Sequence, residues 1–522
     1  MQGASQGSTP DGLSDGRSDG FSDGFSDALS DRLPGRRPRT VAVIGGGISG
    51  LAAAWYVKQA APQTTVTVFE GSPRLGGKLA VGEVGGVQVD LGAESILNRR
   101  PEAVDLVRAV GLAEDVVHPA SISASVWSRG ELVPMPKGHL MGIPADPAVL
   151  AGLLSPAGLK RAESGPSLPS RARLRAEAET DDVAVGTFVA DRFGPEVVDR
   201  LVEPLLGGVY AGHAAEISLR AAVPALVPAY ESGEPLDEAV ARILGAQPAA
   251  ESAKTSPDTA PSPTPTPVFA GIRGGIGRFP TALAQACEAA GIEIRRTAMV
   301  RELSRTPDGW RLVSGPVPAA EAHAFDAVIV AVPGTPAARL LQDAAPVAAA
   351  ELAGIEYASV ALATFVFDDA ALPGGSGFLV PPSDGRFIKA STFSSEKWSW
   401  LAESAKGRTV VRASVGRHRE TADLQRDDAE LAALALADLR TALGRPDALG
   451  TPLDAHVQRW GGGLPQYAVG HVARVARIRE AVASQPGLAV CGAAYDGVGI
   501  AACVASARRA AREITQEERL AT

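Results

Sequence analysis

The sequence predicts an α/β fold, α+β overall, with one nucleotide-binding domain assembled from discontinuous segments. Strand-like apolar runs alternate with Ala-rich or amphipathic helix-like runs along most of the 522 residues. One glycine-rich junction between a strand-like and a helix-like run lies near residue 45, and a second lies near residue 490. Because both junctions can hold parts of a dinucleotide, we expect the two ends of the chain to meet around one ligand.

The composition is that of an ordinary globular protein, with 45% hydrophobic and 21% charged residues. A net charge of -9 argues against a nucleic-acid partner. Three cysteines without a CxxC pattern or a metal-type Cys/His spacing argue against a disulfide framework and a metal site. No apolar run reaches about 18 residues, and the N-terminus lacks a signal-peptide core, so we expect a cytoplasmic protein without a transmembrane segment.

The first junction has all the parts of an ADP-binding βαβ unit. The strand-like run Thr40–Ile44 enters the pattern Gly45-x-Gly47-x-x-Gly50, a helix-like run leaves it, and a second strand-like run ends on Glu70. The first glycine permits a tight turn, the second lets the backbone approach a pyrophosphate, and the third lets helix and strand pack closely. The helix N-terminus attracts phosphates, and Glu70 can accept hydrogen bonds from ribose hydroxyls.

Three further segments extend this candidate site. In Ser72–Lys78 (SPRLGGK), the paired glycines permit close backbone approach, and Arg74 or Lys78 can neutralise phosphate charge. Val89–Ser95 would then bring the backbone back to the bound ligand. Near the C-terminus, Val498-Gly499-Ile500 opens a helix whose dipole could stabilise negative charge on a reduced flavin. An ordinary final strand–helix pair is the alternative interpretation of that last segment.

The remaining periodic runs define the rest of the expected architecture. Strands are expected at Thr40–Ile44, Val66–Glu70, Phe325–Val332, Ser359–Phe367, Val410–Val415 and Leu488–Cys491. Helices are expected at Ile48–Ala60, Phe279–Ala290, Ala429–Leu443 and Val498–Ile514, the third capped by Asp427 or Asp428.

One internal stretch is more specific than any of these. Glu203–His213 reads EPLLGGVYAGH and is followed by Ile217–Arg220, ISLR. Together with GGIGRFP at Gly274–Pro280 and YDGVGI at Tyr495–Ile500, it resembles the FAD-dependent protoporphyrinogen and coproporphyrinogen III oxidase family, in particular its Gram-positive-type coproporphyrinogen III oxidases. This family lies within the amine-oxidase/phytoene-desaturase superfamily. The resemblance runs from about residue 40 to residue 514.

The resemblance implies FAD as the cofactor, held by Gly45, Gly46, Gly47, Ile48, Ser49, Gly50, Glu70, Gly71, Arg74, Lys78, Gly92, Ala93, Glu94, Ser95, Val300, Trp460, Val498, Gly499 and Ile500. It also implies that Arg100, or else Arg99, pairs with a substrate propionate, and that the backbone of Gly208 lies over a macrocycle. No catalytic side chain is implied, because flavin N5 accepts the hydride. Two departures stand out: Gly-Ala-Glu-Ser-Ile at residues 92–96 replaces the usual Gly-Pro-x-Ser-Phe, and His213 replaces an Asp.

The resemblance further implies a Rossmann-like FAD-binding domain, a mixed-sheet substrate domain and a helical subdomain. FAD-binding segments are expected over 39–100, 268–335 and 456–522, and a substrate-binding domain over 336–455. A helical, substrate-binding region is expected over 101–220, with a polar insertion at 161–180, and a helix with a Pro/Thr-rich flexible insertion over 221–267. Residues 1–38 are low in complexity and are expected to be disordered.

The implied reaction is the oxidation of a tetrapyrrole, with coproporphyrinogen III preferred and protoporphyrinogen IX as the alternative. An amine oxidase, a carotenoid desaturase and a flavin-binding or porphyrin-handling module without activity are more distant alternatives. Gly271–Gly277 has the wrong glycine order for a second dinucleotide site and lacks a clear preceding strand, so molecular oxygen, giving hydrogen peroxide, is the expected acceptor. A transient contact with the next enzyme of the heme pathway is a further expectation.

Overall fold

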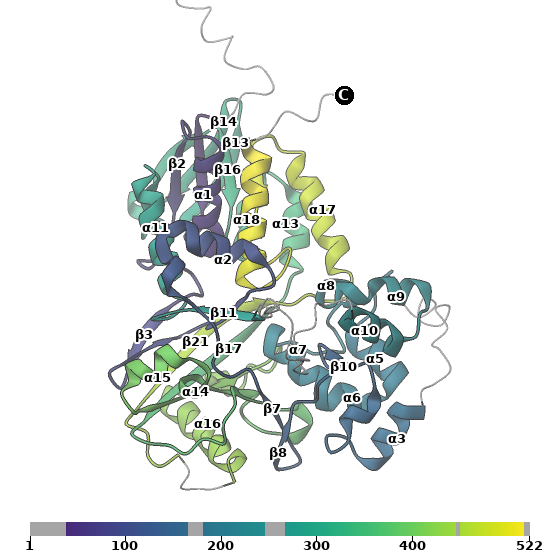
Figure 1. Cartoon of the computed structure of the whole chain (residues 1–522). Helices are drawn as coiled ribbons and strands as arrows, with labels where there is room; N and C mark the ends of the chain where they lie inside the picture. Colours follow the sequence, from purple (N-terminus) through teal and green to yellow (C-terminus); the bar gives the residue numbers. More distant parts are fainter. Residues whose placement is uncertain (1–37, 165–180, 246–266, 445–448, 516–522) are drawn as a thin grey trace, which may run out of the picture.

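The computed structural model describes residues 38–164, 181–245, 267–444 and 449–515. Figure 1 shows one half built on a parallel sheet, a second half built on a mixed sheet, and a group of helices beside the second half. The expected disorder of 1–38 and the expected insertions at 161–180 and 246–267 fall almost wholly outside the described residues. Of the 161–180 insertion, residues 161–164 form the end of helix α3 (Pro156–Ser164).

A five-stranded parallel sheet unites distant parts of the chain. Its order is β12 (Glu293–Arg295), β2 (Thr65–Phe69), β1 (Thr40–Ile44), β16 (Ala327–Val330) and β22 (Leu488–Val490). The helix α1 (Ile48–Ala60) links β1 to β2, with the bounds that the glycine pattern predicts. The α/β fold and the meeting of the chain ends are confirmed, since the first and the last described strands flank β16.

Alternating side chains of this sheet enter two different cores. Val41, Val43 and Ile329 pack against α1, α2 (Pro101–Val107), α11 (Arg278–Ala289) and α18 (Ile500–Thr515). Ala42 and Val328 face the other way, where β13 (Val300–Thr306), β14 (Gly309–Ser314), β15 (Glu321–Phe325), α12 (Gly334–Leu341), α13 (Pro346–Ala353) and α17 (His471–Ala483) cover them. Both faces are therefore buried, as is usual for a parallel sheet.

Most of the expected elements match to within one or two residues, and two differences have a clear consequence. The run expected as one strand over 325–332 is divided at Asp326, whose Oδ2 accepts hydrogen bonds from the backbone N–H groups of Arg39 and Thr40, both at 2.8 Å. That contact fixes the start of β1 beside the start of β16. The C-terminal helix was expected from Val498 but begins at Ile500.

The second half is a seven-stranded mixed sheet. Its order is β21 (Asp454–Pro465), β17 (Tyr357–Phe367), β20 (Thr409–Val415), β19 (Ala390–Phe393), β18 (Gly377–Leu379), β7 (Ser125–Ser128) and β8 (Glu131–Pro134). One face is buried under α16 (Asp428–Ala442), whose first turn is capped by Asp427, the first of the two expected candidates. α14 (Ser394–Lys397) and α15 (Ser399–Ala405) pack near the hairpin of β3 (Val81–Val84) and β4 (Val87–Asp90).

The opposite face of this sheet is only partly covered. Across five strands a row of paired residues shares that face, and each is half-buried: Gln458, Leu362, Ser414, Ala390 and Leu379. We call these five residues the accessible row. Because neighbouring positions on the other face are fully buried under α16, this sheet has one structural face and one that remains accessible.

The helical group stands beside the mixed sheet and has its own core. It contains α3, α5 (Val185–Phe193), α6 (Pro195–Val197), α7 (Glu203–Tyr210), α8 (Leu219–Ala222), α9 (Val227–Ser232), α10 (Leu236–Gly245) and the hairpin of β9 (His139–Leu140) and β10 (Ile143–Pro144). A three-stranded sheet of β5 (Ile96–Leu97), β11 (Phe269–Ile272) and β6 (Val116–Val117) lies near the junction of the two halves in Figure 1.

The packing divides the chain differently from the expected segments at two places. Helices α12 and α13, which fall in the expected substrate domain, pack in the core beside the parallel sheet. Most of β21, which falls in the expected third FAD-binding segment, belongs to the mixed sheet. In both cases the element joins the layer that buries its apolar side chains.

We predict that Gly50→Ala strongly destabilises the parallel half. A Cβ at residue 50 would lie 1.8 Å from the carbonyl oxygen of Gly45, so helix α1 would have to move away from its own entry loop. The expected cost is about 3 kcal/mol or more, measured as a lower melting temperature or loss of soluble protein. Gly245→Ala is the control, because a Cβ there meets nothing within 4 Å. Equal melting temperatures for the two variants would contradict the prediction.

Candidate functional site: a dinucleotide site beside an accessible sheet face

The glycine loop between β1 and α1 is held by backbone contacts that only glycines permit. Gly45 has φ +112°, and its N–H donates to the carbonyl of Phe69 at 2.8 Å. Gly46 accepts from the N–H of Gly76 at 2.9 Å, and Gly47 forms an isolated bridge with Gly76. The two predicted glycine segments therefore lie side by side, with the N-terminus of α1 between them.

Glu70 stands at the end of β2, as the spacing predicts, and its carboxylate holds the loop. One oxygen accepts from the N–H of Gly46 at 2.7 Å, and the other accepts from the N–H of Ser72 at 2.8 Å. Each carboxylate oxygen has further lone pairs, so Glu70 retains capacity to accept from ribose hydroxyls.

The segment around Val300 lies beside Glu70. Ala298 donates its N–H to the carbonyl of Glu70 at 2.8 Å, and the side chain of Met299 lies against Gly71. Val300 begins β13 and is nearly buried, while Met299 is 52% exposed. The structure thus brings Val300, Gly71 and Glu70 together at one end of the glycine loop.

The two predicted cations of the Ser72–Lys78 loop have different environments. Arg74 donates to the carbonyls of Leu75, Gly77 and Leu79, so its guanidinium holds the loop in shape. Lys78 reaches inward, with its Nζ 5.9 Å from the ring centroid of Tyr357, and burial lowers the pKa of Lys78. An anion near Lys78 would be held by an ammonium that is largely removed from water. The guanidinium of Arg74 is used to hold the loop backbone.

The C-terminal junction presents a helix N-terminus. Ile500 is the first residue of α18, and the N–H of Cys503 donates to the carbonyl of Gly499 at 3.0 Å. A Cβ at Gly499 would meet nothing within 4 Å, so the space in front of this turn is open. Val498 packs against the helical group, which connects the junction to α7. Ile48 and Ser49 of α1 complete the surroundings, since Ser49 is close enough to Cys503 to influence the pKa of its thiol.

The loop after β4 is fixed by a buried ion triad. Glu94 pairs with Lys397 at 2.7 Å and with Arg412 at 2.8 Å. Burial would raise the pKa of Glu94, but Lys397 and Arg412 hold that pKa at about 2. Arg412 also donates to the carbonyl of Gly92 at 2.6 Å, and Lys397 donates to Ser95 Oγ at 3.0 Å.

The side chain of Glu94 therefore points to the mixed sheet, so any cofactor contact would come from the backbone of this loop. Ala93 is exposed at its tip. Trp460, from β21, donates its indole N–H to the carbonyl of Leu91 at 2.9 Å, and its ring lies against Gly92.

The predicted substrate residues lie on different elements. Arg99 and Arg100 follow β5, and Arg100 precedes α2, where it pairs with Glu102 at 2.9 Å. Gly208 is exposed on α7, and a Cβ there would lie 3.6 Å from Leu379 Cδ2, at one end of the accessible row. The backbone of α7 thus lies close to the accessible face of the mixed sheet.

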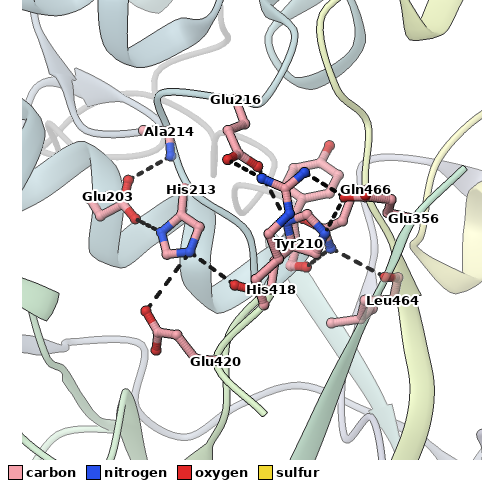
Figure 2. Close-up of polar contacts among 11 residues, drawn as sticks. Glu203, Tyr210, His213, Ala214, Glu216, Glu356, His418, Glu420, Leu464 and Gln466 are labelled. Atoms are coloured by element: carbon pink, nitrogen blue, oxygen red, sulfur yellow. Dashed lines mark hydrogen bonds and ion pairs between the residues drawn. The ribbon is translucent and has the colours of Figure 1, made fainter.

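His213, which departs from the usual Asp, joins the helical group to the mixed sheet. Its Nδ1 contacts Glu203 at 3.2 Å, and its Nε2 contacts the carbonyl of His418 at 3.1 Å, as Figure 2 shows. The hydrogen bond with Glu203 raises the pKa of His213. The imidazole of His213 is therefore paired with the carboxylate of Glu203. In the resembling family an acid stands at the position of His213, so the charge at this position differs in sign.

The prediction that no clear strand leads into Gly271–Gly277 is wrong. Strand β11 runs into the first two residues of this segment and is antiparallel to β5 and β6. The N-terminus of the following helix α11 is filled by Asp90, which accepts from the N–H groups of Ile276 at 3.0 Å and Gly277 at 3.1 Å. Burial raises the pKa of Asp90 to about 6. A phosphate would have to displace that carboxylate, so this segment does not form a second dinucleotide site.

Several functional residues were missed because their partners are remote in sequence. Asp90, Lys397 and Arg412 shape the loop beneath the glycine segments, and Leu379 faces Gly208. The one signal present was an acidic residue closing the apolar alternation Val87-Gln88-Val89-Asp90. Among the described residues no cluster of three metal-binding side chains occurs, and no described helix is long and apolar enough to cross a membrane.

These features fit FAD. Open glycine backbone, an acidic residue at the ribose position and two separate helix N-termini converge from segments near residues 45, 75, 92, 300, 460 and 500. The arrangement defines a flavin-dependent oxidoreductase whose cofactor domain is discontinuous.

Known proteins agree with this class. The family described as flavin containing amine oxidoreductase matches residues 48–515. The coproporphyrinogen III oxidase of Mycobacterium tuberculosis H37Rv is 36% identical over 484 residues, which cover 92% of this chain and 98% of that protein. The corresponding enzyme of Bacillus subtilis is 31% identical and covers 89% of this chain and 95% of its own.

Solved structures agree as well. A chain from Exiguobacterium sp. 255-15, assigned provisionally as a protoporphyrinogen oxidase, has a TM-score of 0.76 at 31% identity and covers 92% of this chain and 99% of its own. The present chain therefore belongs to the flavin containing amine oxidoreductase family, within its branch of FAD-dependent porphyrinogen oxidases.

We predict that Glu94→Gln destabilises the protein by about 3–5 kcal/mol, because two buried cations lose their shared partner. The wild-type pKa of about 2 lies below the unfolded value, so the ionised triad stabilises the fold above pH 4.5. That stabilisation is lost as the pH falls from 4.5 toward 2. The melting-temperature difference between wild type and variant should therefore shrink over this interval. Glu83→Gln on the neighbouring β3 is the control, and a pH-independent difference would contradict the prediction.

Proposed function

We propose that this protein catalyses the FAD-dependent oxidation of coproporphyrinogen III to coproporphyrin III in heme biosynthesis. The observation that supports it most is the full-length similarity to the coproporphyrinogen III oxidase of Mycobacterium tuberculosis. An accessible sheet face beside Gly208 and next to the flavin loops gives a flat macrocycle a place to lie. The mostly apolar accessible row suits such a ring system.

The reaction removes six electrons in three cycles. Over the three cycles, three bridge carbons each lose a hydride, two pyrrole nitrogens each lose a proton and the fourth bridge carbon loses a proton; bound FAD would supply the two-electron acceptor. With molecular oxygen as the final acceptor, three O2 are reduced to three H2O2 for each porphyrin formed. Because aromatisation favours the product, the protein need only bind, orient and shield the ring.

The residues of the chain have positioning roles in this proposal. Lys78 and the two helix N-termini hold the anionic part of the cofactor, and the Glu94 triad keeps the Gly92 loop against the sheet. The backbone of Gly208 and the accessible row enclose the macrocycle, and Arg100 pairs with a propionate at its rim. A transient contact with the next heme-pathway enzyme remains an expectation.

Protoporphyrinogen IX is the second candidate substrate. The protoporphyrinogen oxidase of Bos taurus is 28% identical over 499 residues and is covered to 99%. An amine substrate is less well supported, because the cyclohexylamine oxidase of Brevibacterium oxydans IH-35A shares the fold at only 17% identity, with a TM-score of 0.63.

The test is direct. The purified protein, with its flavin spectrum recorded, is mixed in air with each porphyrinogen, and porphyrin fluorescence and hydrogen peroxide are followed. We expect three peroxides for each coproporphyrin III and a kcat/KM for coproporphyrinogen III at least tenfold above that for protoporphyrinogen IX. The reverse preference would select the second candidate. Bound FAD with no porphyrin formed from either substrate would refute an oxidase.

We predict that Arg100→Ala raises the KM for coproporphyrinogen III about tenfold, because a charge-assisted hydrogen bond to a propionate is lost. Its kcat should change little, since binding alone is affected. Arg108→Ala is the matched control: it removes an exposed arginine that pairs with Asp105 just after α2. An unchanged KM for Arg100→Ala would remove this assignment.

A further inference from the structure

Two further cations, Lys389 and Arg417, lie near one end of the accessible row. They are on other elements than Arg100. Lys389 directly precedes Ala390 of β19, and Arg417 follows β20. The backbone N–H of Lys389 donates to the carbonyl of Ser414 at 2.8 Å, and its carbonyl accepts from Val380 at 2.9 Å. Backbone hydrogen bonds thus hold Lys389 between Ser414, a member of the row, and Val380, which follows Leu379.

Both cations are almost completely buried, with 6% of each residue exposed. Within the described ranges, Lys389 Nζ has no hydrogen bond and no ion pair. Arg417 donates to the carbonyl of Val380 at 3.2 Å and lies 3.7 Å from Glu420. Burying an ammonium without a hydrogen-bond partner is costly, and an anionic group beside it would offset part of that cost.

The nearby acids supply only part of a counter-charge. Glu420 is half exposed, and its two oxygens lie at 3.7 Å from Arg417 and 3.8 Å from His213. The charge of Glu203 also acts on Arg417, but its carboxylate is hydrogen-bonded to His213 and to the N–H of Ala214, as Figure 2 shows. Glu216 and Glu356 are paired with Arg419 and His418. Among the described residues, Glu420 is therefore the one acid paired with this pair of cations, and it pairs with Arg417.

The pair also has the right position for a substrate group. Val380 contacts both members through its backbone, and the preceding residue, Leu379, lies 3.6 Å from where a Cβ on Gly208 would stand. The pair is therefore within two residues of the point where α7 meets the accessible row. Arg100 belongs to a different element, at the start of α2.

We propose that Lys389 and Arg417 together bind a carboxylate of the substrate, as a second anionic contact besides Arg100. The inference rests on the proposed function, and it deepens it by naming the substrate class: a tetrapyrrole whose carboxylates reach more than one side of the site. Coproporphyrinogen III carries two propionates where protoporphyrinogen IX carries two vinyl groups. A planar guanidinium and a point-like ammonium suit the two oxygens of one carboxylate.

The electrostatics favour an anion at this position. Burial and, after it, the charge of Arg417 lower the pKa of Lys389 to about 7, with Glu420 opposing the shift. Burial also lowers the pKa of Arg417. Both directions are those of cations that lack a full counter-charge.

The test uses the FAD-loaded full chain with Lys389→Met, which keeps most of the length of the side chain and removes its charge. We expect a KM for coproporphyrinogen III raised at least tenfold with kcat within a factor of two, and Lys389→Arg within threefold of wild type. A second arm measures the Kd of coproporphyrin III and of its tetramethyl ester by fluorescence. Wild type should prefer the free acid, and Lys389→Met should reduce this preference at least fivefold.

Controls separate the two claims. Lys160→Met removes an exposed lysine of α3 and should change neither KM nor the preference. If wild type oxidises coproporphyrinogen III but Lys389→Met has the same KM and the same preference for the free acid, the carboxylate site is refuted and the function stands. If wild type oxidises neither porphyrinogen, the function fails. In that case the Kd measurements alone test the carboxylate site. Equal Kd values of the wild type for coproporphyrin III and its tetramethyl ester would overturn the carboxylate site.

Discussion

The ion triad of Glu94, Lys397 and Arg412 is the contact on which the relation between the two halves depends. It joins a loop next to the cofactor segments to the mixed sheet, and its members are separated by about 300 residues along the chain. Such a buried group is stable only when every partner is present, because each charge has left water. Since Arg412 also holds the carbonyl of Gly92, the same charge sets the backbone path under the cofactor. The Gly92 loop and the accessible face of the mixed sheet are therefore held in a fixed relative position.

A second constraint acts between backbones. The segments at Gly45–Gly50 and Gly76–Gly77 lie side by side, with a Cβ at Gly77 only 3.3 Å from Gly47 Cα, and Glu70 accepts from the N–H of Gly46. This leaves the N-terminus of α1 facing a space edged by main chain. The protein has a net charge of -9, so an anionic cofactor cannot be attracted by the overall field. Local N–H groups and Lys78, whose pKa is lowered by burial, have to supply the attraction.

What the sequence predicted well was local. The spacing of the glycines and of Glu70 gave α1 and the start of the dinucleotide site, because strand, turn and helix follow one another within thirty residues. What it could not predict depends on remote partners. Asp326 divides an apolar run because its carboxylate binds the start of β1, 286 residues away. Strand β11 was missed because only four residues form it, and one of them, Phe269, is 39% exposed. Lys389 follows the apolar pair Phe387-Ile388, but a lysine at a strand start gives no local signal that its side chain is buried.

The distribution of charge on the mixed sheet connects these points. At one end Arg412 is paired with Glu94 at 2.8 Å, while at the other Arg417 lies 3.7 Å from the half-exposed Glu420. Between them lies the mostly apolar accessible row. The hydrogen bond with Glu203 raises the pKa of His213, so a base stands between Glu203 and Glu420 close to Arg417. A protonated His213 shares these two carboxylates with Arg417 and makes the local charge more positive. Under the proposed carboxylate site, this positive charge favours an anionic group of the substrate beside Lys389 and Arg417.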